Sequence, residues 1–163
     1  MKSVLTACLM ICLAGVANAQ LKGFGLGPYV EYGVPSGDFQ QTHKNGYGLG
    51  LGADIRLGKW GLTGSAGYMH FGGKTISDES GSHSPSSIKA FPIRAGVKYR
   101  FIPAMYLKLE SGMARLSGDD KSAFIISPGI GVRLLGLDLQ AKYEIWKGDQ
   151  TRSFAGLKAG INF

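Results

Sequence analysis

The sequence predicts an all-β fold: an eight-stranded antiparallel up-and-down transmembrane β-barrel that follows a cleaved signal peptide. Apolar residues alternate with polar residues or glycine along most of the chain after residue 20, which is the pattern of half-exposed strands. The alternating segments are about 10 to 13 residues long. A tilted strand needs roughly 9–11 residues to cross a bilayer, whereas strands of soluble proteins usually have about 5–6. The connections are alternately longer and shorter, as in barrels of the outer membrane.

The first 19 residues have the features of a secretory signal peptide. Lys2 gives a positively charged start, the apolar run Val4–Val16 follows, and Ala17-Asn18-Ala19 fits the small-x-small cleavage pattern. The apolar run is shorter than the roughly 20 residues of a transmembrane helix. We therefore expect residues 1–19 to be removed and residues 20–163 to form one barrel domain.

The composition and the motifs exclude several kinds of site. Both cysteines, Cys8 and Cys12, lie in the expected signal peptide, so the mature chain has no thiol for a disulfide, a metal or a nucleophile. The glycine-rich runs fall within strands and no helix follows them, so they do not predict a nucleotide site. We expect no catalytic residue, no cofactor, no metal and, despite a net charge of +7, no nucleic-acid partner.

Eight segments carry the alternation. In the second segment Leu49, Leu51 and Ile55 share one face, and Asp54 and Arg56 lie on the other. In a membrane barrel the apolar face contacts lipid and the charged face lines the lumen. The facing is ambiguous in the third segment, where two equally mixed sets of residues compete. The segments span approximately 22–34, 47–57, 62–71, 88–99, 105–116, 123–134, 136–146 and 154–163.

The connections indicate which end of the barrel faces the cell. Those after the first and third segments, 35–46 and 72–87, are long and polar. Those after the second, fourth and sixth segments are short, and those after the fifth and seventh are intermediate. Outer-membrane barrels have long extracellular loops and short periplasmic turns. We therefore expect a cell outer-membrane location, with both termini at the periplasmic end.

The last segment resembles the signal that the barrel-assembly machinery of the outer membrane reads on a final strand. Its outward face ends with an aromatic residue and consists of Leu157, Ala159, Ile161 and Phe163. The resemblance implies that the assembly machinery is a partner during biogenesis. The alternative is a final strand that simply ends on an aromatic residue.

The first connection carries a family pattern. Val34–Phe39, followed by Asn45–Gly50, is similar to the P-x-G-x-F … G-x-G opening of small outer-membrane β-barrels. This superfamily includes porin-family proteins of Bacteroidetes-type bacteria and relatives of the OmpA, OmpX, OmpW and opacity proteins. The resemblance implies the barrel fold and the outer-membrane location, and it implies no reaction and no ligand.

A set of charged residues is expected to face the lumen. An eight-stranded barrel is just wide enough for side chains to fill, and charges in such a space need partners. We therefore expect a network of ion pairs and hydrogen bonds that plugs the barrel. The alternative is a narrow water path that favours anions, for which the many inward glycines would leave room. The residues are Glu31, Asp54, Arg56, Arg94, Lys98, Lys108, Glu110, Arg133, Asp138, Lys142, Glu144 and Lys158.

Three functions remain open. We favour a non-enzymatic barrel with a structural or surface-interaction role through its extracellular loops. A small diffusion channel for anions or small solutes is the alternative. A lipid A-modifying enzyme is the third, because Ser82-His83-Ser84 with Asp78 and Glu79 supplies residue types for nucleophilic catalysis. We expect that stretch to be a solvated loop, because catalytic groups must be held within about 0.5 Å of their working geometry.

Two groups of residues are expected to contact the membrane, and the barrel is expected to be a monomer. Aromatic residues near strand ends predict interfacial girdles; these are Trp60, Tyr99, Tyr106, Trp146 and Phe163. Basic residues of the outer loops predict contact with the phosphates of lipopolysaccharide. These are Lys44, Lys74, Lys121, Lys147 and Arg152.

Overall fold

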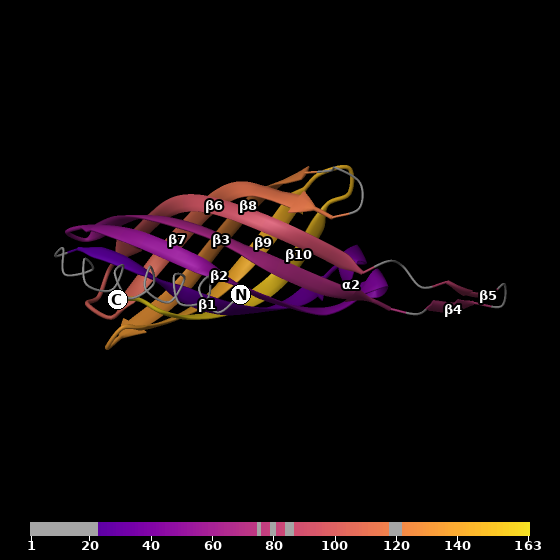
Figure 1. Ribbon diagram of the computed structural model, residues 1–163, viewed down its shortest axis with the longest axis horizontal. Helices are drawn as coiled ribbons and strands as arrows, with labels where there is room; N and C mark the ends of the chain where they lie inside the picture. The colour runs from indigo at the N-terminus through magenta and orange to yellow at the C-terminus, as the bar shows by residue number, and fades with distance from the viewer. Residues whose placement is uncertain (1–22, 75, 79–80, 84–86, 118–121) are drawn as a thin grey trace, which may run out of the picture.

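The chain forms a closed eight-stranded barrel in which sequence neighbours pair antiparallel, as predicted (Figure 1). The computed structural model describes residues 23–74, 76–78, 81–83, 87–117 and 122–163, so the expected signal peptide lies outside the described residues. Around the barrel the strand order is β1-β10-β9-β8-β7-β6-β3-β2. The strands are β1 Phe24–Ser36, β2 His43–Leu57, β3 Trp60–Gly73, β6 Ile88–Arg100, β7 Met105–Leu116, β8 Ser122–Leu134, β9 Leu137–Lys147 and β10 Arg152–Ile161.

The side chains of each strand point alternately outward and inward. Ile93 and its neighbour Arg94 show the contrast, with 65% and 1% of their surface exposed. The outward set is apolar, as the lipid-facing wall of a barrel requires. The structure also settles the facing of β3: Thr63 and Phe71 belong to its buried inward set, and Leu62 belongs to its exposed outward set.

The two ends of the barrel have different connections, and we name them accordingly. At the short-turn end lie the turns between β2 and β3, β6 and β7, and β8 and β9, together with the C-terminus (Figure 1). At the α2 end lie the helix α2, Asp38–Thr42, and a small hairpin of β4, Ile76–Asp78, and β5, Gly81–His83, which extends beyond the barrel. No helix in the described part of the chain is both long and apolar enough to span a membrane.

Both connections that we expected to be long polar loops contain regular secondary structure. In the first, β1 continues to Ser36 and β2 already begins at His43, so α2 fills a short gap. Gly37 has a positive φ of 60°, which reverses the chain, and Phe39 of α2 turns into the barrel and is buried. An apolar anchor therefore replaces a free loop. In the connection between β3 and β6, the short strands β4 and β5 pair with each other from Ile76↔His83 to Asp78↔Gly81.

The barrel closes where the first strand pairs with the last. The pairing of β1 with β10 runs from Tyr29↔Gly160 to Ser36↔Ser153, and it is continued by two backbone hydrogen bonds between Leu26 and Phe163. Between these two stretches the backbone of β10 comes very close to Gly27. A Cβ atom at position 27 would lie 1.6 Å from the carbonyl oxygen of Ile161, so this seam accepts only glycine.

We predict that Gly27→Ala prevents proper closure of the barrel, because the added methyl group would overlap the backbone of β10. An unboiled sample of the variant should lose the faster-migrating folded band that barrels give in gel electrophoresis. Gly52→Ala is the matched control: Gly52 is the pairing partner of Gly27 in β2, and its Cβ would meet Tyr29 at an ordinary 3.7 Å. A Gly27→Ala protein with the same folded band and the same urea resistance as the control would refute the role of this contact.

Candidate functional site

Packed aromatic side chains close the lumen at the α2 end. Phe39 comes from α2, Phe71 from β3, Trp146 from β9 and Phe154 from β10, and we call these four residues the aromatic plug. The ring centroids of Phe39 and Phe71 are 5.0 Å apart, and those of Phe71 and Phe154 are 5.1 Å apart. Such edge and tilted contacts are the preferred arrangements of aromatic pairs. The plug is buried, so the barrel has an apolar core at this end.

The prediction of an interfacial position is wrong for two of the five aromatic residues. Trp146 and Tyr106 face the lumen, with 0% and 1% of their surface exposed. The reason is strand facing: Trp146 continues the inward series of Lys142 and Glu144 along β9. Trp60 and Phe163 do lie exposed on the outside, at the short-turn end.

Next to the plug lies a cluster of buried ion pairs, which we call the Arg94 cluster: Glu31, Arg94, Lys142 and Glu144. Arg94 contacts Glu144 at 2.7 Å and Glu31 at 3.5 Å. Lys142 contacts Glu31 at 2.6 Å and also pairs with Glu144. The indole nitrogen of Trp146 donates a hydrogen bond of 2.6 Å to Glu144, which joins the cluster to the plug. Two cations thus meet two carboxylates, as burial of charge requires.

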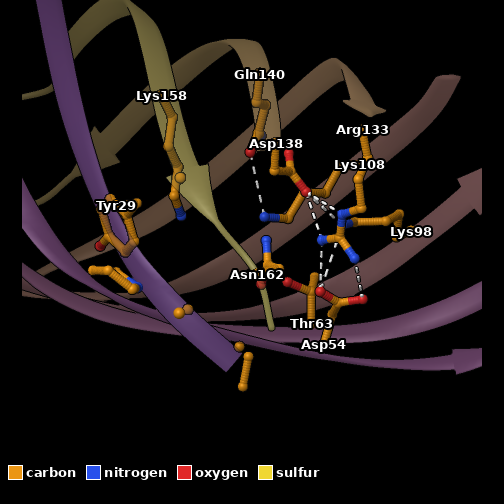
Figure 2. A pocket seen from close by; sticks show the side chains of 16 residues that line it. Tyr29, Asp54, Thr63, Lys98, Lys108, Arg133, Asp138, Gln140, Lys158 and Asn162 are labelled. Carbon is orange, nitrogen blue, oxygen red and sulfur yellow. Dashed lines mark hydrogen bonds and ion pairs between the residues drawn. The ribbon is translucent and has the colours of Figure 1, made fainter. Parts of the chain in front are cut away.

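A second group of ion pairs lies near the short-turn end, and we call it the Arg133 cluster: Asp54, Lys98, Tyr106, Arg133 and Asp138. The guanidinium of Arg133 donates to both oxygens of Asp54, at 2.6 and 3.0 Å, and to Asp138 at 2.5 and 2.8 Å (Figure 2). Lys98 contacts Asp138 at 3.4 Å, and the hydroxyl of Tyr106 donates to the same carboxylate. This cluster also balances two cations with two carboxylates.

Between the clusters the lumen is filled by Tyr29 and a few polar side chains. Lys108 contacts Glu110 at 3.0 Å, and the ammonium of Lys158 lies 3.6 Å from the ring centroid of Tyr29. The space that inward glycines leave is therefore occupied. A Cβ atom at Gly50 or Gly67 would lie within 2.6 Å of the Tyr29 hydroxyl. A cavity of about 30 Å³ lies beside these residues (Figure 2), with room for about two water molecules.

The structure places ten of the twelve expected lumen charges in ion pairs inside the barrel. Lys158 faces the lumen and lies over Tyr29. The expectation that Arg56 joins the network inside the lumen is corrected: Arg56 is exposed at the mouth of the short-turn end, because β2 ends one residue later. Arg100 lies at the same mouth and was not among the expected lumen charges, although it continues the inward series of Arg94 and Lys98 along β6.

The remaining candidate residues lie in separate places. Leu157, Ile161 and Phe163 of the expected assembly signal are exposed on the outer wall, and Ala159, on the same face, is half-buried. Ser82 and His83 lie on β5 and Asp78 on β4, whereas Glu79 and Ser84 fall outside the described residues. A short hairpin therefore stands where we expected a solvated loop, and whether it is solvated stays a prediction.

These features define a class of protein: a small β-barrel with an apolar outer wall and a lumen filled by its own side chains. A family model of the outer membrane protein beta-barrel domain matches residues 4–163, and the chain belongs to this family. The link to Bacteroidetes-type bacteria stays a prediction.

Solved structures share the fold. Ail of Yersinia pestis, the attachment invasion locus protein in complex with the heparin analogue sucrose octasulfate, is 19% identical with a TM-score of 0.53, covering 86% of this chain and 97% of Ail. The N-terminal β-barrel domain of Pseudomonas aeruginosa OprF is 13% identical with a TM-score of 0.56, covering 85% and 99%. At these identities the likeness shows the fold alone. No curated protein matches the chain.

We predict that Glu144→Gln destabilises the barrel by about 3–5 kcal/mol, because Arg94 and Lys142 would then share one remaining carboxylate, that of Glu31. Urea unfolding in lipid vesicles, followed by tryptophan fluorescence, measures the loss. Asp38→Asn makes the same carboxylate-to-amide change at an exposed position of α2 and should alter stability by less than about 0.5 kcal/mol. Equal effects of the two substitutions would show that the Arg94 cluster does not stabilise the fold.

Proposed function

We propose that this protein is a non-conducting, non-enzymatic barrel of the outer membrane that acts through contacts at its α2 end. The observation that carries the proposal is the filled lumen. The aromatic plug closes one end, and two charge-balanced clusters occupy the space behind it. A diffusion channel needs a continuous water path, and a cavity of about 30 Å³ does not provide one.

The α2 end is the part of the molecule that is built for contacts outside the membrane. Its hairpin, β4 and β5, extends beyond the rim of the barrel (Figure 1). By the loop pattern of outer-membrane barrels this end faces away from the cell. Of the residues of the enzymatic alternative, Asp78, Ser82 and His83 lie on this hairpin, away from the lipid-facing wall on which lipid A would rest.

The rim of the α2 end carries a ring of positive charge that fits the phosphates of lipopolysaccharide. Lys89, Arg115 and Lys147 lie at the α2-end termini of β6, β7 and β9, are exposed and sit on the outward side of their strands. The described rim also holds Lys44, Lys74 and Arg152, whereas Lys121 falls outside the described residues. Ail, with the same fold, holds the polyanion sucrose octasulfate. We infer that this rim holds the anionic lipid of the outer leaflet.

The filled lumen predicts that the folded protein gives no reproducible open steps in a planar lipid bilayer. The bilayer is bathed in concentrated KCl, and single-channel current is recorded after insertion is confirmed by the folded band on a gel. A known open porin in the same bilayer provides the positive control. Steps of constant size that scale with the amount of protein would instead establish the diffusion channel.

The basic rim predicts that Lys89→Gln, Arg115→Gln and Lys147→Gln together weaken lipopolysaccharide association at low salt by about tenfold or more, since each surface cation contributes about 1 kcal/mol. Binding is measured by titrating labelled protein in micelles with lipopolysaccharide at two salt concentrations. Lys59→Gln, at the short-turn end, is the control and should bind as the parent does. Unchanged association of the triple variant, or equal binding of dephosphorylated lipopolysaccharide, would count against the proposal.

A further inference from the structure

The short-turn end of the barrel opens into a hollow of about 340 Å³, at the lower end of the size range of small-ligand pockets. Its walls come from the start of β1, the ends of β2, β6 and β8, and the turns beside them. Four cationic side chains and one carboxylate line it, in the described part of the chain: Arg56, Lys98, Arg100, Arg133 and Asp54. We call this hollow the basic mouth.

Two of the four cations in the basic mouth are already neutralised. Arg133 is held by Asp54 and by Asp138 behind it, and Lys98 contacts the same two carboxylates at 4.0 and 3.4 Å. These four groups are the charged members of the Arg133 cluster, and their charges balance. Arg56 and Arg100 therefore form the excess, and neither makes an ion pair with any residue that the structure describes.

The strand between the two arginines leaves room for them to approach one ligand. Arg56 is the last residue but one of β2, Arg100 ends β6, and β3 runs between these strands. The residue of β3 that pairs with Arg56 is Gly61, whose position has no side chain to separate the guanidinium groups. A Cβ atom at Gly61 would lie 3.9 Å from Nη2 of Arg100, so Arg100 extends over this glycine.

Two uncompensated guanidinium groups at one hollow are suited to an anion with several oxygens. A guanidinium presents a planar fork of N–H donors that matches phosphate, and it stays charged at any physiological pH. The turns that border the mouth are apolar and exposed, including Phe101, Ile102 and Leu135. Such turns belong at the membrane interface, where the phosphates of lipid headgroups lie.

We propose that the basic mouth is a phosphate-binding site in which Arg56 and Arg100 hold the phosphate oxygens. The same chemistry recognises a free phosphate anion and the headgroup of an anionic phospholipid. The site is at the opposite end of the barrel from the lipopolysaccharide rim, and it requires neither conduction nor the outer contacts proposed above.

The first experiment tests the free anion. The mature protein is folded in a neutral detergent and titrated calorimetrically with inorganic pyrophosphate. We expect saturable binding that weakens with added salt, and a loss of at least tenfold in affinity for Arg56→Gln/Arg100→Gln. Because both side chains lie outside the balanced clusters, this variant should keep the folded gel band. Lys59→Gln, which removes an exposed cation of the same end that does not line the hollow, is the matched control and should bind as the parent does.

The second experiment tests the lipid headgroup. The protein is placed in nanodiscs of phosphatidylcholine and phosphatidylglycerol, and the lipids that stay bound are identified by native mass spectrometry. The headgroup is the source if the parent and the Lys59→Gln control retain phosphatidylglycerol that Arg56→Gln/Arg100→Gln loses. Pyrophosphate binding without retained lipid identifies the free anion. Absence of both, or binding that the double variant keeps in full, overturns the proposal.

Discussion

The rest of the structure depends on one constraint: charges enclosed in a narrow barrel must find their partners inside it. Arg94 shows this most clearly, because its side chain is fully buried and lies between Glu31 and Glu144. These three residues come from β6, β1 and β9, so the ion pairs connect walls of the barrel that are not adjacent in the sheet. They also fix the facing of the strands, since a shift by one residue would move every charge into lipid.

Volume is the second condition that the lumen satisfies. Large inward side chains are placed opposite inward glycines, so that the barrel is filled without being forced open. Tyr29 lies against Gly50 and Gly67, and a Cβ atom at Gly131 would come within 2.4 Å of Tyr106. The inward glycines were expected to leave room for a water path, but the space beside them is taken up by these tyrosine rings. The filled lumen and the glycine-rich strands are therefore one feature.

The period-two alternation was sufficient to predict the eight strands and the facing of most of them, because only a strand with two different environments produces it. Applied strictly, it would also have placed Trp146 and Tyr106 inside; the assumption of an interfacial girdle overrode it. Two features could not be predicted. The partner of each charge depends on how the strands are staggered around the barrel, and α2 depends on Phe39 packing against Phe71 of β3, a contact that the alternation along a single strand does not reveal.

The distribution of charge moves the search for function from the lumen to the ends of the barrel. Each ion cluster balances its own cations, and the net positive charge of the chain is left at places that the clusters do not reach. One is the rim at the α2 end, with Lys89, Arg115 and Lys147 on the lipid-facing side. The other is the basic mouth, with Arg56 and Arg100. Inside the barrel every cation of the two clusters is paired and Lys158 lies over Tyr29, whereas the cations at the two ends are the ones on which both proposed anion sites depend.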